Sequence, residues 1–299
     1  MTRPPMIDPV DLGTWPTPLE EAPRLAARLG LAQLWFKRDD LLGLGGGGNK
    51  IRKLRYTCAQ ALASGAATVV TSGAPQSNHA RLTAAAAARL GLACVLVLGG
   101  RPVPERRGNL VLDELAGAEI VWAGDSPLEA VVAAEAEKRS AYVIPFGGSS
   151  PVSIQGYVEC GRELRAQVPG VGDVDVVVAL GSGGTMAGLV RELGPARVIG
   201  VDCGAVPDPR ATVAGLLGDD ADPAALRIDG SQVGAGYSTL TEAVRAALTT
   251  TARDEGVFLD PTYTGRAMAA LLEGTFTHGD RVVFLHSGGL PGLFGHPQI

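Results

Sequence analysis

The stretch Gly45-Gly46-Gly47-Gly48-Asn49-Lys50-Ile51-Arg52-Lys53-Leu54 runs from four consecutive glycines into a segment with helical character. Glycine adopts backbone conformations with positive φ without steric cost. An ordered glycine run loses much conformational entropy on folding, so we expect it to serve a close approach of the backbone to a ligand. Lys50 would then lie at the edge of that ligand site, where a buried amine can be tuned for covalent chemistry.

The composition is typical of a globular α/β protein. With 299 residues, 46% of them hydrophobic, the chain can form one large or two ordinary domains. Aromatic residues make up only 5%, which favours a core of Ala, Val and Leu, as in helices packed on a parallel sheet. The net charge of −5, without a basic stripe, argues against a nucleic-acid partner.

The chain shows no apolar run of membrane-spanning length and no signal-peptide core at its N-terminus, so we expect a cytoplasmic protein. Its four cysteines are far apart and lack a metal-binding spacing, so no metal site is expected. They are interpreted as free thiols: Cys58, Cys94, Cys160 and Cys203.

Short apolar strands alternate with helical segments, which indicates βαβ units and parallel sheets. The expected strands are 34–38, 67–71, 93–98, 119–122, 141–145, 175–180, 197–202 and 281–286, with helices at 49–64 and 78–90. A second run of this pattern begins near residue 160, after the turn-forming segment 146–151. We therefore expect two α/β domains, each a doubly wound, mostly parallel sheet.

The segment Gly181-Ser182-Gly183-Gly184-Thr185 lies between an apolar strand and a helix. Such a loop places free backbone N–H groups and a hydroxyl at a helix N-terminus, where the helix dipole favours an anion. The pattern predicts a phosphate site; the alternative is a tight strand-to-helix turn without a ligand.

Gly43, Gly45 and Gly48 fit the spacing G-x-G-x-x-G, which would indicate a nicotinamide-dependent oxidoreductase. That motif also requires an acidic residue about 20 positions later. The corresponding segment 65–69 has none, which argues against this alternative. The run is not a nucleoside-triphosphate loop either, because Lys50 follows Asn and precedes Ile. Alone, Lys50 would be interpreted as a solvated lysine at a helix start.

Polar residues follow several of the other strands. Gln76-Ser77-Asn78-His79 begins a helix, with Ser77 as its expected N-cap, at the strand end where open α/β sheets bind ligands. His286-Ser287-Gly288-Gly289 follows the last strand, and Tyr237 and Tyr263 lie in two further loops. Each motif alone is ordinary, and either tyrosine could be a packing residue; the combination carries the argument.

Together these motifs resemble the family of pyridoxal-phosphate enzymes that contains D-cysteine desulfhydrase and 1-aminocyclopropane-1-carboxylate deaminase, in the tryptophan-synthase-β fold group (fold-type II). The landmarks are 37–40, 48–54, 76–79, 181–185, 259–265 and 286–295. The resemblance implies the cofactor pyridoxal 5'-phosphate, a small amino-acid substrate and a homodimer. It also implies a large cofactor-binding domain, 1–52 plus 158–299, and a small α/β domain, 53–157.

The resemblance assigns roles to the site residues. Lys50 is similar to the lysine that binds the cofactor aldehyde covalently and then moves protons at the substrate Cα. Asn78 matches the partner of the cofactor's ring hydroxyl, and Gly181, Ser182, Gly183, Gly184 and Thr185 match its phosphate cup. Ser77 matches the residue that engages the substrate carboxylate, with Asn78, His79 and Tyr263 beside it. Tyr237 and Tyr263 match two catalytic tyrosines, and Thr264 and Ser287 the surroundings of the ring nitrogen.

Two positions favour the desulfhydrase branch. Thr264 stands where the deaminase has a glutamate, and His79 where it tends to have glutamine. Both imply α,β-elimination from a β-substituted amino acid, with cysteine giving pyruvate, ammonia and sulfide. Elimination from L-cysteine or L-cysteate, ring-opening deamination, racemisation and a catalytically silent binding protein remain alternatives. The family's usual aromatic residue is replaced by His296, and Ala74-Pro75 is an unusual lead into Gln76.

Overall fold

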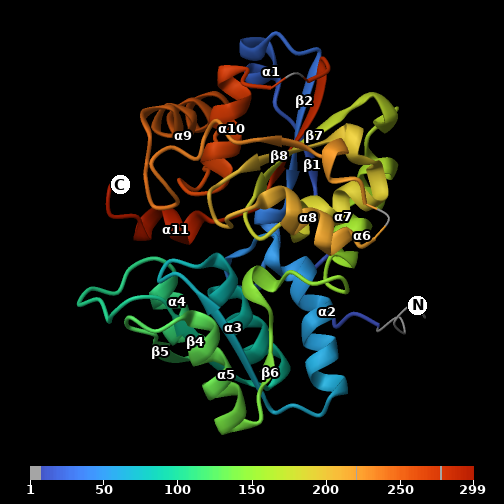
Figure 1. The fold of residues 1–299 in the computed structure, drawn as a ribbon. Helices are drawn as coiled ribbons and strands as arrows, with labels where there is room; N and C mark the ends of the chain where they lie inside the picture. Colours follow the sequence, from blue (N-terminus) through green and yellow to red (C-terminus); the bar gives the residue numbers. More distant parts are fainter. Residues whose placement is uncertain (1–7, 220, 277) are drawn as a thin grey trace.

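A computed structural model of the chain describes residues 8–219, 221–276 and 278–299, which form two lobes with one sheet in each (Figure 1). The larger sheet lies in the upper lobe of this view and the smaller sheet in the lower lobe. Within these residues, no helix has both the length and the apolar character needed to cross a membrane.

The larger sheet has six strands in the order β1-β2-β10-β7-β8-β9. They are β1 (Leu19–Glu21), β2 (Gln33–Arg38), β7 (Asp175–Leu180), β8 (Val198–Asp202), β9 (Arg227–Asp229) and β10 (Arg281–His286). All neighbours are parallel except β1, which pairs antiparallel with β2. Because β2 pairs with β10, the sheet unites the first and the last thirds of the chain.

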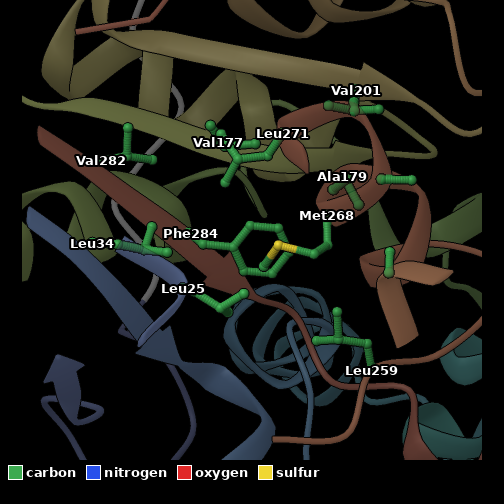
Figure 2. Packing of buried hydrophobic residues seen from close by; sticks show 14 of the residues in the cluster. Leu25, Leu34, Val177, Ala179, Val201, Leu259, Met268, Leu271, Val282 and Phe284 are labelled. Carbon is green, nitrogen blue, oxygen red and sulfur yellow. The ribbon is translucent and has the colours of Figure 1, made fainter. Parts of the chain in front are cut away.

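Helices cover both faces of this sheet because its strands are apolar on both sides. Val177 and Ala179 of β7 point into one core, where α1 (Pro23–Leu29), α9 (Glu242–Glu255) and α10 (Thr264–Glu273) pack. Figure 2 shows part of this core, with Phe284 and Met268 at its centre. The alternate residues of β7 point into the other core, against α6 (Gln155–Gln167), α7 (Gly184–Leu193) and α8 (Pro209–Leu217).

The smaller sheet has the order β5-β4-β3-β6, and all its neighbouring strands are parallel. Its strands are β3 (Thr68–Gly73), β4 (Ala93–Leu98), β5 (Glu119–Trp122) and β6 (Tyr142–Val143). It is flanked by α2 (Lys50–Ala63), α3 (Asn78–Leu90), α4 (Asn109–Leu115) and α5 (Leu128–Arg139), and α11 (Leu290–Gly295) lies near α4. The consecutive residues Val69 and Val70 of β3 enter different cores, so this sheet is covered on both faces as well.

The expected fold class, two doubly wound and mostly parallel sheets, is confirmed. The bounds expected for α3, β4, β5, β7 and β10 coincide with the observed ones. The strands β1 and β9 were not expected, because three-residue edge strands carry too short a pattern to be recognised. The division into 1–52 plus 158–299 and 53–157 stays a prediction.

A buried ionic cluster joins α2 to the larger sheet. The Arg52 guanidinium binds the Asp39 carboxylate at 2.9 Å and the Glu163 carboxylate at 2.8 Å. Lys37 Nζ lies 2.5 Å from Glu163 and donates to the carbonyl of Thr17. Because Arg52 lies two positions after Lys50, this cluster fixes the first turn of α2 in place.

Candidate functional site

A cavity of about 410 Å³ opens between the loops that follow the carboxyl ends of the two sheets. A smaller cavity adjoins it, and both share Lys50, Asn78, Ser182 and Tyr263. The large cavity is lined by Lys50, Gly73, Ala74, Pro75, Ser77, Asn78, His79, Gly99, Leu128, Phe146, Gly147, Ser182, Gly204, Ala205, Tyr237 and Tyr263. Most of the residues that the sequence singled out therefore meet in one place.

The glycine run approaches the protein's own backbone, and this is the physical reason for it. A Cβ atom added to Gly47 would lie 1.9 Å from the carbonyl oxygen of Asp40, and Gly47 has a φ of 75°. The next residues bond to two other segments: Gly48 N–H donates to Asp39 O, and Asn49 N–H donates to Ser287 O, far away in the chain. The glycines thus let Lys50 enter the cavity between packed segments of the backbone.

Lys50 has an amine that loses its proton easily. Burial lowers its pKa to about 8, against the opposing charge of Asp260. Its Nζ lies 5.8 Å from the centre of the Tyr263 ring. A lysine with this pKa is partly neutral near physiological pH, which nucleophilic attack requires.

The predicted phosphate cup has open donors. Gly183 caps α7 in the left-handed conformation without a side-chain hydrogen bond to the first turn. The loop from Gly181 to Thr185 leads into this helix end, and its members Gly181, Ser182, Gly183 and Thr185 line the smaller cavity. Asn49 Nδ2 donates to Thr185 Oγ1 at 3.0 Å, which leaves the hydroxyl proton of Thr185 for another acceptor. This arrangement suits an anion.

Lys53 lines neither cavity, but it lies next to the predicted phosphate cup, and the sequence analysis assigned it no role. It is fully buried, and its Nζ donates to Gly147 O at 2.5 Å and to Ser149 Oγ at 3.0 Å. Ser149 Oγ in turn lies 2.8 Å from Ser182 Oγ in the cup. Burial and the neighbouring Lys50 hold the pKa of Lys53 well below its ordinary value. The only signal in the sequence was its position three residues after Lys50, on the same helix face.

Asn78 is oriented by two donors. Asn109 Nδ2 and an Arg81 nitrogen donate to its Oδ1 at 3.0 and 3.4 Å, so its own amide N–H groups are free to face the cavity. Arg81 also donates to the carbonyl oxygens of Gly45 and Gly47. Neither Arg81 nor Asn109 was expected, and together they couple the glycine run to Asn78.

Ser77 and His79 line the cavity from the start of α3. Ser77 Oγ accepts the Ala80 N–H at 3.1 Å, which confirms its N-cap role. The Thr71 hydroxyl donates to Ile144 O, so it accepts a hydrogen bond from His79 Nε2 at 2.8 Å. Nδ1 of His79 is therefore an acceptor, buried and without a described partner. Burial lowers the pKa of His79 well below 6.5, so its ring is neutral.

Tyr237 and Tyr263 form a pair, with hydroxyl oxygens 2.6 Å apart and ring centres at 5.9 Å. Burial raises the pKa of Tyr237 to about 12 and also raises that of Tyr263, so both hydroxyls keep their protons. The fully buried Arg266 holds the loop that carries Tyr237. Its guanidinium donates to the carbonyl oxygens of Cys203, Val233, Gly236, Tyr237 and Thr239.

Thr264 and Ser287 differ in where they point. The Thr264 hydroxyl donates to Asp260 Oδ1 at 2.7 Å and accepts the Asp260 N–H at 2.8 Å. It is fully buried and lines neither cavity. Ser287 lines the smaller cavity. Of the two residues expected near the cofactor's ring nitrogen, Ser287 is thus the one that faces the site.

Residues 10–288 match the model of a protein family described as pyridoxal-phosphate dependent enzymes. The chain belongs to this family. A D-cysteine desulfhydrase of Yersinia pestis is 40% identical over 95% of the chain and 94% of the relative. A Pyrococcus abyssi protein, named provisionally as a 1-aminocyclopropane-1-carboxylate deaminase, is 39% identical over 97% of the chain and 94% of the relative.

Solved structures agree. The crystal structure of a homologue of 1-aminocyclopropane-1-carboxylate deaminase superimposes with a TM-score of 0.85 at 34% identity, covering 99% of this chain and 98% of that one. A threonine deaminase shares the fold, with a TM-score of 0.68 at 23% identity. The chain is therefore a pyridoxal-phosphate-dependent enzyme, and the nicotinamide alternative falls away.

The residues at the site fit this cofactor. An open helix end and a free hydroxyl proton at Thr185 suit the doubly negative phosphate. Two buried amines with lowered pKa, Lys50 and Lys53, lie beside each other and lack a bonded carboxylate among the described residues. A phosphate nearby would compensate one of these amines, while the other remains available for the aldehyde.

Proposed function

We propose that this enzyme is a carbon–sulfur lyase that acts on a small amino acid with a neutral leaving group at Cβ, cysteine first among them. The observation that carries the proposal is the lining of the two cavities. Among the described residues, neither cavity contains an acidic side chain, and Ser287, which lines the smaller cavity, offers only a neutral hydroxyl. Such a lining favours elimination over ring opening, which needs a protonated ring nitrogen.

We assign the cofactor's contacts to residues of both lobes. Lys50 would bind the aldehyde, Asn78 the ring hydroxyl, Ser287 the ring nitrogen, and Gly181, Ser182, Gly183, Gly184, Thr185 and Lys53 the phosphate. When bound, pyridoxal phosphate supplies the electron sink that lets an amino acid lose its Cα proton. Thr264 takes a supporting role, because its hydroxyl holds Asp260 at the start of α10.

The protein's residues would then move the protons. Lys50 takes the Cα proton, a role that suits an amine with a pKa of about 8. Ser77 binds the substrate carboxylate, with Asn78 and His79 beside it. The paired hydroxyls of Tyr237 and Tyr263 give a proton to the leaving sulfur as the Cβ–S bond breaks and its electron pair stays on sulfur. With one water consumed, cysteine yields hydrogen sulfide, pyruvate and ammonium.

The cavity also bears on the alternatives. L-cysteate would place a sulfonate beside a neutral His79, with Lys50 as the one charged side chain of the described lining, so a thiol is the better leaving group. Racemisation would share the Cα proton transfer at Lys50 without loss of sulfur. D- and L-cysteine are both kept as candidates, because the side of the cofactor that Lys50 and Ser77 occupy decides between them.

Reconstitution tests the proposal. We expect the protein to bind pyridoxal phosphate, to absorb near the visible edge, and to trap the cofactor irreversibly after borohydride treatment. Lys50→Ala should abolish this trapping, whereas Lys138→Ala, a surface lysine on α5, should not. A protein that stays colourless with excess cofactor would overturn the proposal.

We further propose a cytoplasmic homodimer. Apolar side chains are exposed on the neighbouring helices α4 and α11, with Leu115 78% and Phe294 69% exposed. Light scattering on the purified protein should give twice the mass of the 30.7 kDa chain. A mass equal to that of one chain would refute the dimer.

A further inference from the structure

Part of the large cavity has no role in the elimination of cysteine itself. Five of its lining residues are apolar and take part in none of the contacts above: Ala74, Pro75, Leu128, Phe146 and Ala205. We call this set the apolar wall. A thiol is small beside it, so the wall offers burial that free cysteine cannot use.

Four separate segments build the apolar wall, which shows that it is part of the folded site and not one mobile loop. Ala74 and Pro75 follow β3, Leu128 is the first residue of α5, Phe146 begins the turn after β6, and Ala205 follows β8. Phe146 remains 47% exposed, so the wall reaches the solvent opening.

One glycine is required where the apolar wall meets the phosphate loop. Gly147 has a φ of 61°, and a Cβ there would lie 2.1 Å from Ser182 Oγ, so only glycine lets the turn carrying Phe146 approach the phosphate loop so closely.

The electrostatics of the cavity exclude a charged substituent. Lys50 is the one charged side chain among its described lining residues, and it is engaged by the cofactor and the Cα proton. His79 is neutral because burial lowers its pKa. A carboxylate or sulfonate at this wall would lose its hydration without gaining a counter-charge.

We propose that the preferred substrates are S-substituted cysteines, thioethers whose alkyl or aryl group packs against the apolar wall. This inference rests on the proposed lyase function. The Cβ–S bond breaks, the electron pair leaves with sulfur, and the sulfur takes a proton from the tyrosine pair. With one water consumed, the products are the corresponding thiol, pyruvate and ammonium.

A homologous series tests the idea. Pyruvate release is measured with S-methyl-, S-ethyl- and S-propylcysteine in both enantiomers, beside cysteine, cysteate and β-chloroalanine. We expect kcat/KM to rise about fourfold per added methylene, the ratio that corresponds to burying one CH₂ group. Cysteate should lie well below cysteine. A flat or falling series would overturn the inference.

Binding is measured independently of turnover. Norvaline and aspartate have no leaving group at Cβ, and their dissociation constants follow from the change in cofactor absorption of the holoenzyme. The wild-type holoenzyme should bind norvaline more tightly than aspartate. Leu128→Arg should weaken the binding of norvaline and strengthen the binding of aspartate. The matched control is Ala130→Arg, exposed on the same helix and outside the cavity lining, which should change neither. Thermal unfolding confirms that each variant is folded.

The outcomes separate the two claims. If no β-substituted alanine yields pyruvate, including β-chloroalanine, the lyase function itself fails. If β-chloroalanine and cysteine are turned over but the thioether series does not rise, or aspartate binds as tightly as norvaline, only the thioether inference is rejected.

Discussion

The hydroxyl oxygens of Tyr237 and Tyr263 lie 2.6 Å apart, although the two residues come from different loops. The contact depends on Arg266, which binds five carbonyl oxygens around the loop of Tyr237. Since burial raises the pKa of both tyrosines, the pair is a store of protons beside the cavity and not a base. This relationship links a structural arginine to the chemistry proposed for the leaving group.

Tyr237→Phe removes one hydroxyl of the pair and should lower kcat for cysteine about 100-fold, the usual range for loss of a general acid. Binding of the cofactor should be unchanged, because Tyr237 is assigned no cofactor contact. Tyr142→Phe, whose hydroxyl meets Gln60 in the small lobe, is the matched control and should keep full activity. Equal activity in all three proteins would remove the pair from the mechanism.

Arg266→Lys tests the loop itself. Lysine has three donors in place of the planar guanidinium and cannot reach all five carbonyls, so we expect the Tyr237 loop to loosen. kcat should fall about tenfold while the cofactor dissociation constant changes little. Arg191→Lys is the control, because Arg191 also binds backbone carbonyls, at the end of α8, but lies outside both cavity linings. Loss of cofactor binding in Arg266→Lys would assign the residue to general stability.

Lys53→Met tests the second buried amine. Without this cation beside the cup, the dissociation constant of pyridoxal phosphate should rise at least about tenfold, as for loss of a charge-assisted contact. Pyridoxal without its phosphate serves as an internal control, since its affinity should hardly change. An equal loss of affinity for pyridoxal phosphate and for pyridoxal would mean that Lys53 stabilises the fold and does not bind the phosphate.

The pKa of Lys50 predicts a pH dependence. Only the neutral amine attacks the aldehyde, so the rate of cofactor uptake by the cofactor-free protein should rise with pH and level off above a midpoint near 8. Asp260 raises this pKa, so Asp260→Asn should move the midpoint to lower pH. Stopped-flow absorption measures both profiles, and a midpoint unchanged in Asp260→Asn contradicts this electrostatic assignment.

The cluster at the start of α2 predicts the response to acid. Burial opposes ionisation of Glu163, but Arg52 and Lys37 outweigh it and hold its pKa below 4.5. A lowered carboxyl pKa stabilises the fold above pH 4.5, and this contribution is lost as the pH falls through the folded value. Glu163→Gln should therefore lower the unfolding free energy by about 3 kcal/mol at pH 7 and flatten its acid dependence.

The control for this cluster is Glu159→Gln, which breaks a more exposed pair with Arg55. This substitution should lower the free energy of unfolding by less than about 1 kcal/mol. Denaturant unfolding of the cofactor-free proteins at pH 7 and pH 4 provides the comparison, and an equal loss for both variants would show that burial of the Glu163 cluster is unimportant.

The sequence revealed the elements whose signals are local. The helix α3 and the strands β4 and β7 follow from continuous patterns bounded by turn residues. The motif residues Lys50, Ser77 and Asn78 lie at strand or helix ends, where parallel sheets place their sites. These residues were expected, and the structure brings them to one cavity.

The residues that support the site could not be predicted from such local patterns. Arg81 and Arg266 bind backbone carbonyls of loops far away in the chain. Every residue has such a carbonyl, so the sequence does not show which ones an arginine binds. In the sequence, Lys53 looks like any other lysine on a helix. Its hydrogen bonds to Gly147 and Ser149 are visible only in the structure. For the same reason the sequence could not distinguish Thr264 from Ser287. The Thr264 hydroxyl is hydrogen-bonded to Asp260, whereas Ser287 faces the cavity.

The most direct test of the central claim is the product balance with cysteine. The holoenzyme should release pyruvate and sulfide in equal amounts from one cysteine enantiomer, Lys50→Ala should release neither, and the cyclopropane amino acid should give no 2-oxobutyrate. If the fully loaded enzyme instead forms 2-oxobutyrate from the cyclopropane amino acid and no sulfide from either enantiomer of cysteine, the assignment as a carbon–sulfur lyase is contradicted.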